Sequence, residues 1–290
     1  FFKAVYKHYT PFGLQRFRLD YDGLRNLSFD SPTEFNFKIK RYAEMLWDTY
    51  IVVNLPDIWS PLYDISGCQT YEYQWIKNLG FNMINQITIY SGGSILAQYS
   101  GEWMQNAIDR DETDKKELVN RMTGNIPELY DPKSMHSDNK YPNAFTYINK
   151  DNNTQISPEP SIRGRKLYIP LMAWFCYSTK TALPLIALQY QEINIRIRLK
   201  PLMDLYTIND VDEMPGDNGL SYRMRPNKNV LHHELWRFLQ PPQDVYANTD
   251  LYNQNINSWA AEPHLIGTYV FLGQAERRII ASQEHKILIK

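Results

Sequence analysis

Six histidines and two cysteines are the side chains of this chain best suited to bind a catalytic metal ion. Sandwich folds that hold such a metal commonly use two histidines separated by one residue, and no His-x-His occurs. His232 and His233 are adjacent, so in a strand they would face opposite sides. The other four single histidines considered are far apart: His8, His136, His264 and His285. We therefore expect no metal site and no cofactor.

The common catalytic motifs give no positive signal. The sequence contains no CxxC, HExxH, GxGxxG, Walker-type phosphate loop or GxSxG. Two of the 32 acidic residues could face each other as in a glycoside hydrolase, but no spacing points to a particular pair. Glu102 and Trp103 could begin a sugar-binding platform, although a tryptophan that opens a helix is more often a core anchor. We predict no catalytic residues, and a carbohydrate-binding or carbohydrate-cleaving protein is kept as an alternative.

Two sequons and two cysteines are candidate sites of modification. Asn26 and Asn152 each begin an Asn-x-Ser/Thr sequence in a loop-like stretch, where a glycan could be accommodated. Cys68 and Cys176 cannot make a disulfide framework, so reduced thiols are expected.

The strongest strand signal covers residues 167–199. Residues 167–175 form a nearly unbroken apolar run, typical of a strand that is buried on both faces or crosses between two packed sheets. Pro170 lacks a ladder donor, so a sheet edge or a bulge is expected there. From Ile193 to Leu199 apolar and polar residues alternate, which places one face in the core and one in water. The stretch predicts two long strands joined by a tight connection.

Other segments give weaker strand and helix signals. Period-two patterns predict strands over 16–21, 35–40, 49–55, 82–90, 94–100 and 264–272. Gly92 and Gly93 can take the positive φ of a tight hairpin turn. Helical patterns cover 102–108, 114–122 and 274–281, with Asp114 as the expected cap of the second and an apolar stripe of Leu118, Val119 and Met122.

About eight antiparallel strands with little helix predict an all-β jelly-roll sandwich with helical and long loop insertions. The longest insertions, residues 125–165 and 201–262, are rich in turn-forming residues and have no sustained period. Because alternate connections of a jelly roll emerge together, we expect the loop 56–71 and the insertion 101–165 at one end. Candidate intersubunit contacts in that loop are Trp59, Leu62 and Tyr63.

Bulk composition excludes two classes of partner. A formal charge of -1 provides no general attraction to nucleic acid, so no direct nucleic-acid contact is expected. No apolar run approaches the roughly 18 residues that span a bilayer, so no transmembrane segment is expected. The 43% apolar and 14% aromatic residues fit a globular, β-rich protein with a sizeable core.

Three stretches carry a family signature. They are the runs LYIPLMAWF and ALPLIALQYQEINIRI within 167–199, a Gly-Gly turn followed by Gly-Glu-Trp within 74–103, and the segment 268–289. Together they resemble the major capsid proteins of nucleocytoplasmic large DNA viruses. Two departures from the family pattern occur. Gln191 stands where the resemblance predicts a His, and Met172 and Ala173 are unusual residues at the two variable positions of the Pro-Leu-x-x-Trp-Phe run.

The resemblance implies a double jelly roll. Residues 1–272 would be the first jelly-roll domain, 273–283 a helical connector, and 284–290 the truncated start of the second. It also implies a structural protein without enzymatic activity, which forms trimeric, pseudo-hexameric capsomers that tile an icosahedral shell. Its partners would be neighbouring capsomers and minor capsid and penton proteins, in a virion assembled in the host cytoplasm. A minor capsid or scaffold protein of such a virus is the alternative within the same fold.

Overall fold

Eight of the strands form two antiparallel four-stranded sheets. The structure, a computed structural model, describes residues 11–21, 23, 26–60, 71–111, 113–137, 139–142, 159–188, 190–209, 223–230, 233–241, 259–287 and 289. One sheet has the order β1-β11-β3-β7, from Phe12–Leu19, His264–Leu272, Met45–Asn54 and Lys166–Pro170. The other has the order β2-β8-β5-β6, from Thr33–Lys38, Ile193–Leu199, Ile84–Ser91 and Ser94–Tyr99.

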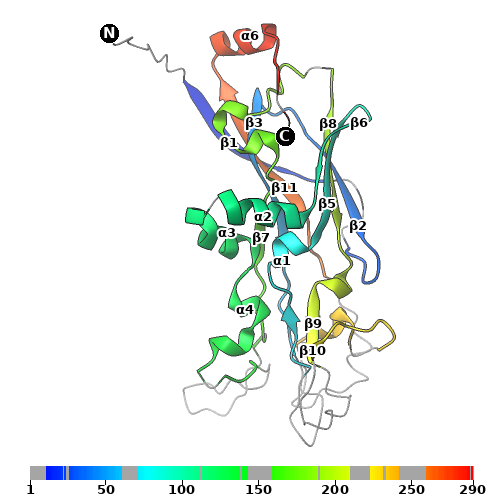
Figure 1. Cartoon of the computed structure of the whole chain (residues 1–290). Helices are drawn as coiled ribbons and strands as arrows, with labels where there is room; N and C mark the ends of the chain where they lie inside the picture. The colour runs from blue at the N-terminus through cyan, green and yellow to red at the C-terminus, as the bar shows by residue number, and fades with distance from the viewer. Residues whose placement is uncertain are drawn as a thin grey trace, which may run out of the picture.

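The order of these strands identifies a jelly roll. Strands β1, β2 and β3 alternate between the two sheets, and the last strand, β11, pairs with the first. Residues from both sheets contribute to one apolar core between them. Figure 1 shows an elongated molecule in which connections run over both ends of the sandwich. The predicted all-β jelly roll is confirmed.

Alternation along the strands explains how the sandwich forms. Phe35 and Phe37 in β2 are fully buried, whereas the residues between and beside them are exposed. Strand β8 follows the same pattern, with Ile195 and Ile197 buried. The hairpin β5–β6 turns at Gly92 and Gly93, whose φ values are +54° and +92°. These predictions from the sequence are confirmed.

The prediction for residues 167–199 is wrong in one respect. Strand β7 ends at Pro170 and β8 begins at Ile193, and the two strands lie in different sheets. The connection contains the 3-10 helices η3 (Trp174–Cys176) and η4 (Thr179–Thr181). The apolar run continues because residues after the strand close the end of the core: Leu171, Ala173, Trp174 and Phe175 are buried. Pro170 does lie on an edge strand, as its missing donor predicts.

Three helices close one side of the sandwich. Helices α1 (Leu79–Asn82), α2 (Gly101–Asp111) and α3 (Lys116–Thr123) pack against one another and against β5 and β7. In Figure 1 they lie across the middle of the molecule. Helix α6 (Gln274–Ser282) lies at the upper end and confirms the helical pattern predicted for 274–281. Among the described residues, no helix has the length and apolar character needed to cross a bilayer.

Three helix details differ from expectation. Asp114 lies in the 3-10 turn η1 (Thr113–Lys115) and does not cap α3. Helix α3 begins at Lys116, and no side chain caps it. Val119 and Thr123, four residues apart, face the sheet, and Leu118 therefore points towards solvent with 59% of its surface exposed. Trp103 is 43% exposed, so the expected core anchor is wrong. It packs on the ring of Tyr99 at the surface.

A candidate assembly surface at one end of the sandwich

Three long connections gather at the end of the sandwich opposite α6. They join β3 to β5, β6 to β7 and β8 to β11, and they carry the small sheet β10-β9-β4, from Arg223–Met224, Tyr206–Asn209 and Gln74–Trp75. They also carry α4 (Pro127–Tyr130) and the 3-10 helices η2 (Pro132–Met135), η5 (Leu202–Asp204) and η7 (Leu235–Leu239). Figure 1 shows α4, β9 and β10 together in its lower part.

Backbone hydrogen bonds join the three connections. Ile58 in the first connection forms a bridge with Ile162 in the second. The Trp59 amide donates to the Phe238 carbonyl of the third connection at 2.8 Å. The expectation that the loop 56–71 and the insertion 101–165 share one end is confirmed for the described parts of 56–71 and of 125–165. It is wrong for the start of the insertion, because α2 and α3 lie across the middle of the molecule.

A buried hydroxyl cluster locks the first two connections together. The Tyr141 hydroxyl donates to the Tyr73 carbonyl at 2.9 Å and lies 2.8 Å from the Ser60 hydroxyl. The Ser60 amide in turn donates to the Ser161 hydroxyl at 3.1 Å. Burial raises the pKa of Tyr141 well above its ordinary value, so this hydroxyl stays protonated and able to donate.

One carboxylate connects all three segments. Glu72 accepts from Lys133 at 2.7 Å and from Arg223 at 3.4 Å, and Arg223 also donates to the Glu72 carbonyl at 2.9 Å. The Glu72 side chain is only 17% exposed, so these pairs are less screened than ordinary surface pairs. Burial lowers the pKa of Arg223, and the Glu72 charge opposes that shift. We call Ser60, Glu72, Tyr73, Tyr141 and Arg223 the loop clasp.

Aromatic rings extend the core beneath the loop clasp. Tyr73 stacks on Tyr206 at 4.7 Å between centroids and meets Trp75 edge-on at 5.2 Å. Phe238 lies 5.1 Å from Tyr73, and Trp259 lies 5.6 Å from Trp75. These contacts anchor the connections rigidly, because aromatic pairs add to the stabilisation from buried area. The alternation Tyr71, Tyr73, Trp75 with polar residues between is a strand signal that the sequence interpretation missed.

The predicted contact and modification residues have different outcomes. Trp59 lies at this end and is half-buried. Leu62, Tyr63, Asn152 and Cys68 lie outside the described residues. Asn26 is exposed and forms an isolated bridge with Ala260. Contacts through Trp59 and glycosylation of Asn26 stay predictions.

The chemistry available to the described side chains is limited. Burial raises the pKa of the Cys176 thiol to about 12, so this cysteine is protonated at neutral pH and is a poor nucleophile. Burial lowers the pKa of His264, and its Nδ1 is bonded to the Glu262 carbonyl at 2.8 Å. Within the described part of the chain, no group of three or more His, Cys, Asp or Glu side chains could hold a metal ion.

Comparison with known proteins identifies the family. The sequence pattern described as "Major capsid protein N-terminus" matches residues 1–222. The chain belongs to this major capsid protein family. It is 28% identical over 211 residues to "Probable capsid protein 4" of Acanthamoeba polyphaga mimivirus, covering 72% of this chain and 35% of that protein. It is 24% identical over 296 residues to the "Major capsid protein" of Phaeocystis pouchetii virus, covering 100% of this chain and 48% of that protein.

Solved capsid structures share the fold. A chain of the PBCV-1 virus capsid matches with a TM-score of 0.54 and 15% identity, over 99% of this chain and 49% of that chain. The Faustovirus major capsid protein matches with a TM-score of 0.54 and 11% identity, over 96% of this chain and 57% of that chain. The chain thus spans between about a third and a half of the length of the curated relatives described above. The resemblance inferred from three sequence stretches is confirmed at the level of the major capsid protein family.

Proposed function

We propose that this member of the major capsid protein family is the main shell subunit of a large double-stranded DNA virus. The observation that carries the proposal is the jelly roll itself: two packed four-stranded sheets support three long connections that the loop clasp holds together at one end. A rigid sandwich with elaborated connections presents large, shape-specific surfaces and needs no reacting groups. Membership of a family named for capsid proteins supports the same role.

The proposed assembly unit is a homotrimer. In this proposal residues 1–272 form the first jelly roll, 273–283 the connector, and 284–290 the start of a second. Three chains with two similar jelly rolls each give a closed ring with a nearly six-fold outline, which can tile a hexagonal lattice on an icosahedral shell. Residues 284–287 have no regular secondary structure, so the start of a second jelly roll at 284–290 stays a proposal.

The proposed partners are proteins of the shell. Each trimer would contact neighbouring capsomers, minor capsid proteins and penton proteins, and assembly would take place in the host cytoplasm before the protein resides in the virion. Neither an enzymatic activity nor a cofactor is part of this proposal. The formal charge of -1 supports contacts of mixed charge with other proteins over direct contact with the genome.

Copy number in purified virions tests the proposal. We expect this protein to be the most abundant polypeptide of the shell when virion proteins are quantified by mass spectrometry against labelled standards. A minor capsid or scaffold protein of such a virus is the alternative role. Only a few copies per virion, or copies in immature particles alone, would overturn the proposal in favour of that role.

A further inference from the structure

A buried carboxylate lies where helix α6 leaves the sandwich. Glu44 directly precedes β3, and its side chain is only 8% exposed. The Leu272 amide, at the end of β11, donates a hydrogen bond to this carboxylate at 2.9 Å, and the Arg277 guanidinium of α6 forms an ion pair with it. One side chain thus joins the start of one strand, the end of its neighbour and the helix that follows. We call Glu44, Leu272 and Arg277 the connector latch.

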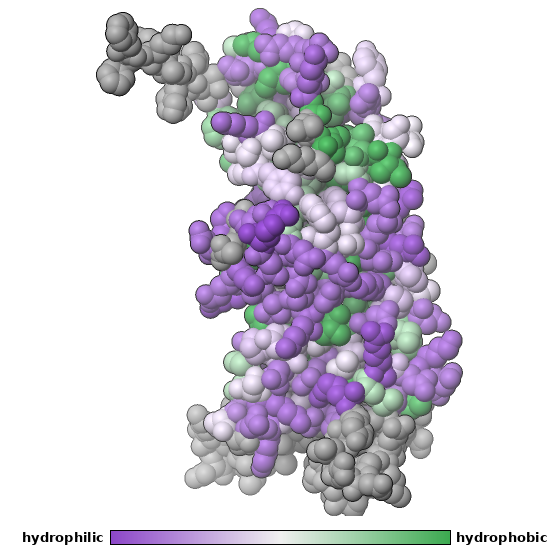
Figure 2. All heavy atoms as spheres, viewed as in Figure 1, coloured by the Kyte–Doolittle hydropathy of each residue, from purple (hydrophilic) through white to green (hydrophobic). Residues whose placement is uncertain are grey.

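Apolar packing does not explain the position of α6. The helix is nine residues long and none of them is buried, whereas isolated helices shorter than about 12 residues are only marginally stable in water. Figure 2 shows hydrophilic side chains over much of α6 at the top of the molecule. Ile279 and Ile280 are not among the described side chains that pack against the core. Other contacts must therefore hold the helix in place.

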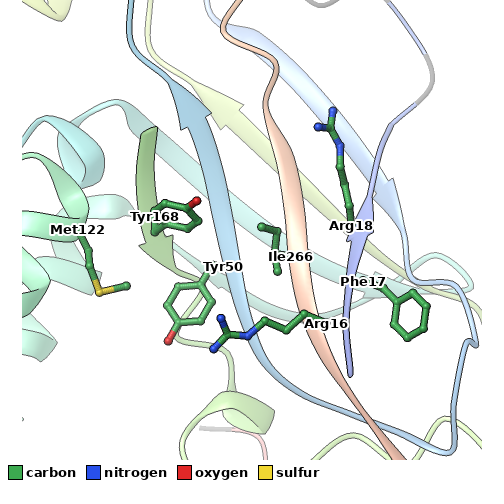
Figure 3. Close-up of a pocket in the computed structure, with 7 residues that line it drawn as sticks. All are labelled: Arg16, Phe17, Arg18, Tyr50, Met122, Tyr168 and Ile266. Atoms are coloured by element: carbon green, nitrogen blue, oxygen red, sulfur yellow. The ribbon is translucent and has the colours of Figure 1, made fainter. Parts of the chain in front are cut away.

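The loop that carries Glu44 is itself held by the sandwich. The Tyr269 hydroxyl of β11 donates to the Lys40 carbonyl at 2.6 Å. Phe17 of β1, which points away from the neighbouring arginine side chains in Figure 3, stacks on Tyr42 with 4.6 Å between ring centroids. Contacts with two strands on either side of the loop therefore present the Glu44 carboxylate from a fixed position.

The electrostatics of the contact favour a lasting attachment. Burial alone would raise the pKa of Glu44, but the Leu272 amide and the Arg277 guanidinium outweigh it, and the pKa lies below its ordinary value. The carboxylate is therefore ionised at neutral pH. It lies beside the N-terminal end of α6, where a negative charge stabilises a helix, and Gly273 at the N-cap supplies no side-chain hydrogen bond of its own.

We propose that the connector latch holds α6 on the end of the sandwich and thereby fixes the direction in which the chain leaves β11. Glu44 acts as a positioning residue in this role. The inference goes beyond the proposed function, because it concerns how this helix is anchored. In the proposed domain division α6 is the connector, so the latch would also set the direction in which the second jelly roll begins. Only this last consequence rests on the proposed function.

Exchange of backbone amide hydrogens tests the latch at Arg277. Arg277→Met removes the guanidinium, and Arg278→Met is the matched control, because Arg278 is exposed and its side chain has no ion pair within the described residues. Methionine and arginine have similar helix propensities. Hydrogen–deuterium exchange of the complete gene product, followed by mass spectrometry, would report on the peptide 274–283. We expect Arg277→Met to speed its exchange at least tenfold and Arg278→Met less than twofold.

Glu44→Gln tests the other partner of the ion pair. The substitution keeps the shape of the side chain and removes its charge, so exchange in α6 should again speed up at least tenfold. Peptides from β5 and β8, which lie in the other sheet, are the internal reference and should exchange as in the wild-type protein.

Three outcomes would overturn the inference. Unchanged exchange of α6 in Arg277→Met and Glu44→Gln would assign the anchoring to the residues beyond the helix, where Ile289 packs against the core. Equal acceleration in Arg277→Met and Arg278→Met would show that the loss of any positive charge loosens the helix. Faster exchange in both sheets of Glu44→Gln, without an effect of Arg277→Met, would show that Glu44 stabilises the sandwich and not the helix. The proposed function is tested separately by copy number, so either can fail alone.

Discussion

The Tyr141 hydroxyl shows how one polar atom can hold two distant segments of this chain. It bonds to Ser60 and to the Tyr73 carbonyl, which lie 81 and 68 residues away in sequence. All three groups are buried, so water cannot replace a lost partner. The relative position of the β3–β5 and β6–β7 connections therefore depends on the hydrogen bonds of this one hydroxyl.

Tyr141→Phe should therefore destabilise the protein without changing its packing volume much. We expect a loss of about 1 to 3 kcal/mol in the free energy of unfolding, because the variant leaves buried groups without a partner. Urea denaturation followed by tryptophan fluorescence measures it. The matched control is Tyr190→Phe, since Tyr190 is 98% exposed and should tolerate the change. Equal stability of the two variants would contradict the role of the Tyr141 hydroxyl.

His264 should make stability depend on pH in a defined window. Burial lowers its pKa below the ordinary value of 6.5, with Arg18 and Lys166 adding to the effect, while the Glu262 carbonyl and Asp20 oppose it. Below pH 6.5 the His264 side chain is protonated more readily in the unfolded chain than in the folded protein. The free energy of unfolding therefore has its full value, as far as His264 contributes, above pH 6.5, and it decreases as the pH falls below that value.

His264→Asn tests this dependence. As the pH falls, the free energy of unfolding of the wild-type protein should decrease by up to about 1.4 kcal/mol for each unit by which folding lowers the pKa of His264. Denaturation at pH 7.5 and at lower pH measures this decrease. The variant should lose less over the same interval, because asparagine does not titrate there. The same slope in both proteins would show that other groups cause the pH dependence.

At the scale of the elements, helices α1 and α2 pack so closely that one position between them must be glycine. Gly101 begins α2 directly against the last turn of α1, and a Cβ atom there would lie 1.9 Å from the Phe81 carbonyl oxygen. The backbone must move to relieve such a contact. Only glycine allows the two helices to close the side of the sandwich in this arrangement.

Gly101→Ala should cost about 3 kcal/mol of stability, at the upper end of overpacking effects. Thermal unfolding followed by circular dichroism would report it as a clear fall in Tm. Gly13→Ala is the control, because its added Cβ would meet only the Phe271 Cβ at an ordinary 3.8 Å. If both variants melted together, the close approach of α1 and α2 would not be a determinant of the fold.

The sequence predicts the elements of this fold better than their connections. Alternation in β2 and β8 and the Gly92-Gly93 turn locate strands correctly, because those signals are local. The strand prediction is wrong for the buried run after Pro170, since an apolar run does not distinguish a strand from a segment that closes the end of the core. The loop clasp was not foreseen because Glu72 and Arg223 are 151 residues apart, and only the folded topology brings them together.

At the scale of the whole molecule, the two ends and the two outer faces of the sandwich differ in structure. The end that carries the loop clasp holds the long connections, whereas the other end carries α6. The outer face of β2-β8-β5-β6 exposes charged and polar side chains along β2 and β8, whereas the outer face of β1-β11-β3-β7 exposes Phe12 and Leu14 beside Arg16 and Arg18. These asymmetries agree with an assembly of identical copies in a fixed orientation.

The native mass of the complete gene product tests the capsid account most directly. Light scattering on a size-exclusion column measures this mass without reference to shape. We expect a stable species of three times the chain mass that persists on dilution, as is typical of a permanent interface. A species that remains monomeric at high concentration would contradict the capsomer and bring the carbohydrate-binding alternative forward.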